Sequence, residues 1–219
     1  MKAIFFLCLV SVSFTAQATA QTALNAKQQA LWEKFGSTIR EADHNLDGVL
    51  GVAIEDLTSG QKFFLHEDEV FAQASSIKIT VLAELYRQNQ EASQGASGKA
   101  KLTDLYTVEA SDLVRDSDIM GGLTPSVTKI TNRDLATMMV AVSDNSATNV
   151  LIDHVGMENV NRLLDSLGLP HTRLRRKMMD LKAAGEGREN VSTPREMMIL
   201  LEQIYRAITI MSGHPYHRE

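Results

Sequence analysis

The stretch from Phe71 to Leu85 reads FAQASSIKITVLAEL and decides the fold prediction. Its apolar residues after Ser75 recur at the spacing of one helical face, which predicts an amphipathic helix that ends near Gln90. Ser75 and Lys78 lie one turn apart at the start of this helix and therefore share a face. An amine in that position can take the proton of the serine hydroxyl and make the oxygen a nucleophile.

The surroundings of this serine–lysine pair favour chemistry over chance. The dipole at the start of a helix stabilises a developing negative charge. Ile77 and Ile79 flank Lys78, and the loss of water around the amine lowers its pKa, which makes it a plausible base. The alternative for the pair is a helix-capping serine followed by an exposed lysine.

The second informative element is the triplet Ser143-Asp144-Asn145. It follows a predicted helix that opens with a capping box from Thr131 to Asp134. The triplet then has three tasks: Ser143 passes a proton to the leaving nitrogen, Asn145 hydrogen-bonds the substrate amide, and Asp144 points inward and fixes the loop. The alternative is a helix end followed by a helix cap, where these residue types are common.

Together, the two elements resemble those of class A β-lactamases and related serine hydrolases, over a range of about Gln28 to Tyr205. The resemblance implies an α/β (α+β) fold like that of serine β-lactamases and transpeptidases, with a helical domain beside an antiparallel sheet. It implies that Ser75 forms the acyl-enzyme with a β-lactam, that the Ser75 N–H supplies half of the oxyanion hole, and that no cofactor is needed. Three alternatives stay open: a D-Ala-D-Ala peptidase, a penicillin-binding acyl trap and a non-catalytic remnant.

The segment from Thr172 to Pro194 is similar to the Ω-loop of that family but departs from it. By resemblance, the glutamate that activates the deacylating water falls on Met178, and a thioether cannot activate water. Asp180 is the nearest carboxylate and is a candidate replacement, although a loop-stabilising role is an equal reading. We therefore expect acylation with slow hydrolysis.

A second departure is the motif Lys-Thr-Gly, which does not occur in the sequence in its lysine, serine or histidine form. By resemblance, this motif lies on an inner strand that supplies the second oxyanion donor and the pocket for the substrate carboxylate. Loss of one oxyanion donor costs about 10²–10³ in rate. We therefore expect little turnover and a sheet without its C-terminal strands.

The remaining elements are predicted from periodicity and turn residues. Their order is helix, hairpin, helices and a last helix, and no strand is predicted after Tyr205. The predicted ranges are a helix over 28–39, strands over 49–57 and 62–65, helices over 146–155 and 157–167, and a helix from Pro194.

The N-terminus is typical of a secretory signal. Met1-Lys2 is followed by an apolar run from Ala3 to Phe14 and by small residues at Ala18-Thr19-Ala20. We expect residues 1–20 to be removed and 21–219 to form one catalytic domain in the periplasm or outside the cell. An uncleaved anchor is the alternative, but the run is shorter than the roughly 20 residues that span a bilayer.

Composition excludes several classes of function. The chain has 219 residues, a formal charge of −5 and no basic run, which argues against a nucleic-acid partner. Its one cysteine, Cys8, lies in the signal, so a disulfide or thiolate metal site is not expected in residues 21–219. The six histidines show no metal spacing; His214 and His217, near the end, read as exposed polar residues. We expect a monomer that acts on a small molecule.

Overall fold

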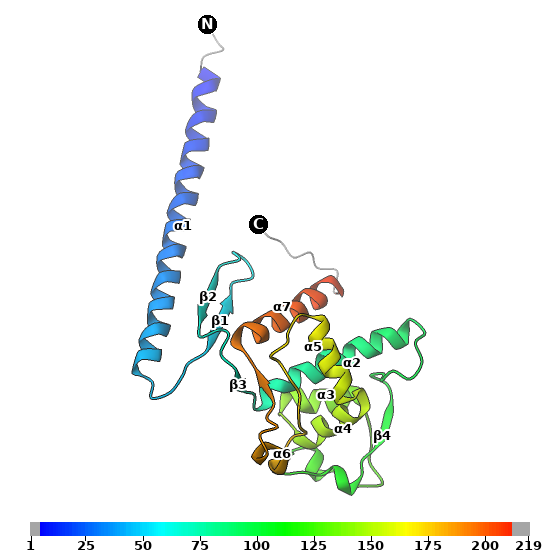
Figure 1. Ribbon diagram of the computed structural model, residues 1–219. Helices are drawn as coiled ribbons and strands as arrows, with labels where there is room; N and C mark the ends of the chain where they lie inside the picture. Colours follow the sequence, from blue (N-terminus) through cyan, green and yellow to red (C-terminus); the bar gives the residue numbers. More distant parts are fainter. Residues whose placement is uncertain (1–4, 212–219) are drawn as a thin grey trace. The chain divides into compact units, whose positions relative to one another are not determined.

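The computed structural model describes residues 5–211 of the chain, and the side chains of residues 25–207 (Figure 1). The chain divides into two compact units, Met1–Leu50 and Gly51–Glu219. The first unit contains one helix, α1 (Phe5–Asn45), so the helix predicted over 28–39 is much longer than expected. Removal of residues 1–20 stays a prediction.

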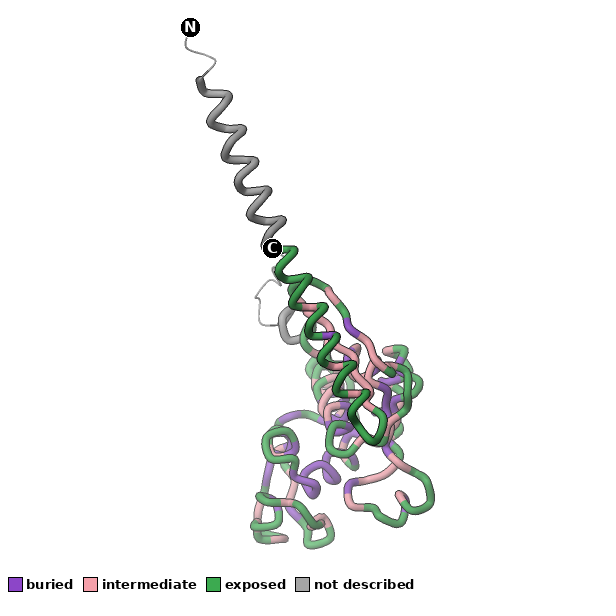
Figure 2. The backbone as a smooth tube through the Cα atoms, turned by 90° about the vertical axis from the view of Figure 1, so that its left-hand side faces the viewer, coloured by how far each residue is buried: buried purple, intermediate pink, exposed green. Residues whose placement is uncertain are grey.

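The second unit is built around α2 (Lys78–Ser93). Helices α3 (Asn132–Ala141), α4 (Asn145–Val155) and α5 (Met157–Ser166) each contact α2. The apolar stripe predicted for α2 is confirmed, because Ile77, Val81 and Leu85 are fully buried. Figure 2 shows many of the buried positions gathered in this larger unit.

The predicted helix ends agree with the structure. Thr131 caps α3, its side chain accepts from the Asp134 N–H, and the capping box is complete. Gly156 and Gly168 follow α4 and α5 with φ of 82° and 73°, a conformation that glycine adopts without strain.

The predicted hairpin is also confirmed. Strand β1 (Val52–Glu55) pairs antiparallel with β2 (Lys62–Leu65). A second short ladder, β4 (Leu105–Thr107) with β5 (Lys129–Thr131), lies in a region expected to be irregular up to Gly122. Such three-residue strands carry too little alternation to be recognised in a sequence. Three 3₁₀ turns, at Ser75–Ile77, Ala110–Asp112 and Met120–Gly122, complete the second unit's short elements.

The loop after α5 is tied to the segment that precedes Ser75. Strand β3 (Phe71–Ala72) pairs antiparallel with β6 (Val191–Ser192), near the end of this loop. The loop also contains the short helix α6 (Leu181–Gly185), which the sequence did not indicate. Helix α7 (Pro194–Met211) begins at the predicted proline and contacts β1. The approach is close: a Cβ on Gly51 would lie 2.3 Å from the Phe71 ring and 2.7 Å from Pro194, so only glycine fits there.

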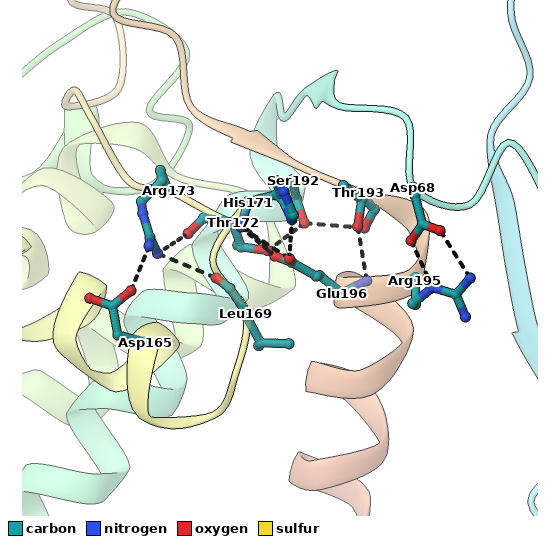
Figure 3. A network of polar contacts seen from close by, with 10 residues as sticks. All are labelled: Asp68, Asp165, Leu169, His171, Thr172, Arg173, Ser192, Thr193, Arg195 and Glu196. Atoms are coloured by element: carbon teal, nitrogen blue, oxygen red, sulfur yellow. Dashed lines mark hydrogen bonds and ion pairs between the residues drawn. The ribbon is translucent and has the colours of Figure 1, made fainter.

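A buried carboxylate joins α7 to the start of the same loop (Figure 3). Glu196 accepts from the N–H groups of His171 and Thr172, from the Thr172 hydroxyl at 2.6 Å and from His171 Nδ1 at 2.8 Å. Burial acts to raise the pKa of Glu196, but these hydrogen bonds outweigh it and hold the pKa below its usual 4.5. The charged form of Glu196 therefore stabilises the fold.

We expect Glu196→Gln to lower the free energy of unfolding by about 1–3 kcal/mol at pH 7, because the added amide N–H groups face donors. A lowered pKa means that the stabilisation is present above pH 4.5 and is lost as the pH falls through the folded-state pKa. The difference between the two proteins, measured by urea unfolding, should therefore shrink below pH 4.5. Glu202→Gln on the same helix is the control, because its ion pair with Arg206 is near the surface and should contribute little. An equal loss in both variants at every pH would contradict this role.

No helix among the described residues is long and apolar enough to cross a membrane. This finding agrees with the prediction that residues 21–219 contain no spanning segment.

Candidate active site

Ser75 opens the 3₁₀ turn that leads from β3 into α2, and its side chain is exposed. The pairing of β3 with β6 fixes the chain immediately before it, and the Gln73 N–H donates to the Asn190 carbonyl at 2.7 Å. Ser75 lies at the wall of a cleft of about 360 Å³. The residues that line this cleft are Ser75, Ser76, Lys78, Ile79, Leu82, Met139, Val140, Ser143, Met197 and Leu201.

Lys78 is the buried polar centre of this cleft, with 4% of its surface exposed. Its amine donates to Ser143 Oγ at 2.9 Å, to Asn145 Oδ1 at 2.8 Å and to the Ser143 carbonyl. The structure therefore brings the serine–lysine pair and the 143–145 triplet to one site, as the sequence predicted. Among these partners, only the Ser143 hydroxyl can both accept a proton and donate one.

Burial lowers the pKa of Lys78 from its ordinary value, and the nearby Asp144 carboxylate opposes this shift. The net direction is downward, so the neutral amine is easier to form than in free lysine. A neutral lysine is the form that accepts a proton from a hydroxyl.

The corner between α3 and α4 presents Ser143 to the lysine. Ser143 has a φ of 59°, in the left-handed region that a residue with a Cβ rarely adopts. Such strain persists only where surrounding contacts enforce it, and it is common at active sites. Here the enforcing contact is the Asp144 N–H, which donates to the Met138 carbonyl at 3.2 Å.

Asp144 is fully buried and points inward, as expected. One oxygen caps α4 by accepting from the Ala147 N–H at 3.0 Å, and the other accepts from the N–H groups of Ile119 and Met120. The Asp144 carboxylate therefore holds the corner and the loop beside it together.

Asn145 is engaged on both sides of its amide. The oxygen accepts from Lys78, and the nitrogen donates to the Arg115 carbonyl at 3.2 Å. Its predicted contact with a substrate amide would require one of these bonds to open, and that role stays a prediction.

Met178 and Asp180 lie apart from the residues that line the cleft within the described part of the chain. Met178 is buried, and its backbone exchanges two hydrogen bonds with the Asn149 side chain, at 2.7 and 3.1 Å. Asn149 lies one turn after Asn145 on α4, so Met178 is held one helical turn from the residue that contacts Lys78. Asp180 caps α6 by accepting from the Ala183 N–H, which favours the loop-stabilising reading over the catalytic one.

The basic residues at the start of the loop form ion pairs within the second unit. Arg173 pairs with Asp165 and Lys177 with Asp153. Arg176 pairs with Glu189, one of the two carboxylates expected for this cluster. These contacts pin the loop.

The sequence reasoning missed two residues that organise the site. Asn149 and Glu196 each bind loop backbone across many positions, and both are buried. The signal available was a polar residue on an otherwise apolar helix face, because a buried polar side chain must find partners. Within the described residues, no group of three His, Cys, Asp or Glu side chains is arranged to hold a metal ion.

Comparisons with known proteins give concordant results. A β-lactamase from Sphaerobacter thermophilus is 28% identical with a TM-score of 0.67, over 78% of this chain and 62% of that one. A reconstructed last common ancestor of Gram-negative class A β-lactamases is 29% identical with a TM-score of 0.65, over 77% and 62%. PBP-A has a TM-score of 0.66 over 83% and 62%, but at 22% identity it supports the fold alone. No protein with a curated description matched.

The chain thus spans 62% of the length of each of these three structures. A sequence model of the Beta-lactamase enzyme family matches residues 34–213, most of the 219 residues. With the serine β-lactamase-like fold and the Lys78 site on the page, the conclusion is that this chain belongs to the β-lactamase enzyme family.

Proposed function

We propose that the protein is a serine acyl-transferring hydrolase that opens β-lactams by forming an acyl-enzyme on Ser75. The observation that carries the proposal is the position of the Lys78 amine, which contacts Ser143 and Asn145 beside the cleft that Ser75 lines. A base, a proton acceptor–donor and a nucleophile on one cleft are the minimum set for acyl transfer.

The proposed first step uses these three side chains. Neutral Lys78 takes the proton of the Ser75 hydroxyl as its oxygen attacks the lactam carbonyl carbon. The carbon–nitrogen bond then breaks, and Ser143 passes the proton from Lys78 to the leaving nitrogen. The Ser75 N–H, at the start of a helix, donates to the carbonyl oxygen as negative charge develops on it.

The proposed second step is slow. Hydrolysis of the acyl-enzyme needs a base that activates water, and the buried thioether of Met178 supplies none. The Asp180 carboxylate is a weaker candidate, because it caps α6. We therefore infer that the chain accumulates the acyl-enzyme and turns over slowly. In a related fold, a PBP-A variant forms an acyl-enzyme complex with penicillin G.

Export to the periplasm, through a cleaved signal over 1–20, belongs to the same proposal, as does action by a monomer. It rests on the charged start, apolar run and small residues of the N-terminal sequence.

The test is intact mass spectrometry of the purified protein after addition of penicillin G. We expect a persistent adduct of one penicillin on the peptide that contains Ser75, and none on the Ser75→Ala variant. An adduct of equal amount on the alanine variant, or no adduct at any concentration that labels a class A β-lactamase, would refute the proposal.

A second candidate is a D-Ala-D-Ala peptidase, which uses the same acyl chemistry. The absence of a base at Met178 favours it equally, because a trap for penicillin is a common property of such enzymes. Release of D-alanine from a diacetyl-Lys-D-Ala-D-Ala peptide, faster than the loss of the penicillin adduct, would select the peptidase.

A further inference from the structure

The wall of the Ser75 cleft is apolar. Six of its residues, contributed by α2, α3 and α7, are hydrocarbon or thioether side chains: Ile79, Leu82, Met139, Val140, Met197 and Leu201. The polar members are Ser75, Ser76 and Ser143, with Lys78 as the one charged side chain on this wall. A group that enters the cleft therefore loses water and meets mainly apolar surface.

That single charge is not available to bind an anion. The three N–H groups of the Lys78 ammonium are matched by three acceptors, Ser143 Oγ, the Ser143 carbonyl and Asn145 Oδ1. The buried Asp144 carboxylate lies close enough to affect the lysine and offsets its charge. When Lys78 acts as the base it is neutral, so the cleft then carries no cation.

The loop beside the triplet does not reverse this balance. It carries one cation, Arg115, and two exposed carboxylates, Asp116 and Asp118. The Asp116 carbonyl accepts from the Asn145 N–H, which brings this segment next to the site. A carboxylate on the substrate therefore meets desolvation without a compensating cation from these residues.

We propose that this cleft accepts uncharged, apolar acyl donors, namely neutral carboxylic esters and esterified lactams, in preference to substrates with a carboxylate near the scissile carbonyl. The inference rests on the proposed acylation of Ser75 and adds the class of substrate. With an ester, Ser75 Oγ bonds to the carbonyl carbon and Lys78 takes the hydroxyl proton. The bond from the carbonyl carbon to the alkoxy oxygen breaks, and the alcohol leaves with that proton.

The test compares penicillin G with its methyl ester, which differ only in the carboxylate. We expect the ester to acylate Ser75 about tenfold faster, or more, by time-resolved mass spectrometry, because tenfold corresponds to a modest charge-burial penalty. p-Nitrophenyl hexanoate should release nitrophenol in a burst that the Ser75→Ala variant lacks. Equal rates, or faster reaction of the free acid, would overturn the inference.

A matched pair of variants locates the cause. Val140 lines the cleft from α3 and is 59% exposed, so it can be changed without opening the core. Val140→Lys should shift the ratio of acid to ester rates about tenfold toward the acid, and Val140→Thr should leave the ratio as it is. The same ratio in both variants would overturn the assignment of the preference to this wall.

Failure of the underlying chemistry has a separate signature. If neither penicillin nor its ester labels Ser75, the proposed function is wrong, whatever the cleft prefers. Methyl NMR shifts of Leu82 and Val140 on addition of methyl phenylacetate and of phenylacetate then decide the preference. Tighter binding of the ester supports it, and equal or tighter binding of the acid overturns it.

Discussion

Replacing Lys78 by methionine is expected to slow acylation of Ser75 by about 10²–10⁴-fold, the usual contribution of a positioned general base. The side chain lies buried between the serine and the 143–145 corner, and methionine fills a similar volume without a nitrogen. The rate of adduct formation with penicillin G, followed by mass spectrometry, gives the effect directly. A variant within fivefold of the parent would show that Lys78 is not the base.

The pH dependence separates a base from a merely structural lysine. Burial lowers the pKa of Lys78 from 10.5, so the neutral amine forms at a lower pH than in free lysine. The acylation rate of the parent should rise with pH and level off at a midpoint below 10.5, because only the neutral form accepts the proton. The Lys78→Met variant should lack this rise. Ser143→Ala should keep the rise but acylate more slowly, because it removes the proposed shuttle and leaves the amine.

Most of the larger elements could be predicted because each carried a periodic or capping signal. The apolar stripe of α2, the Thr131 capping box and the glycine after α4 each appear in the structure where the sequence indicated. The β4–β5 and β3–β6 ladders were missed, because two- or three-residue strands are fixed by tertiary contacts and not by local pattern. The extent of α1 was underestimated for a related reason: residues before Gln28 were read as a targeting segment and not as part of a helix.

The site was predictable where residue type and spacing coincide. Ser75, Lys78 and Ser143 line one cleft, because the helical spacing of the first pair and the corner after α3 direct them together. The capping role of Asp180 was not predictable, because a short helix after Met179 gave no sequence signal. The pairing of Asn149 with Met178 across the fold is likewise a tertiary property.

That pairing makes Met178 the position where one substitution should change the fate of the acyl-enzyme. Met178→Glu is expected to speed hydrolysis of the penicillin adduct by about 10²-fold or more, because it supplies a carboxylate base one helical turn from the residue that contacts Lys78. Burial disfavours the charged carboxylate and raises its pKa, which suits a group that must take a proton from water. The half-life of the adduct, measured after removal of free penicillin, gives the effect.

Met178→Gln is the matched control, because glutamine has the shape and polarity of glutamate without a basic oxygen. Both variants place a polar group at a buried position, so both should lose a similar part of the free energy of unfolding, about 1–3 kcal/mol. If loosening of the loop were the cause of faster hydrolysis, the two variants would shorten the adduct half-life equally. A base at this position predicts instead that only the glutamate variant does so, and that its hydrolysis rate rises as the new carboxyl loses its proton. Unchanged half-lives in both would mean that the water is activated from elsewhere, and Asp180→Asn in the parent would then be the variant that lengthens the half-life.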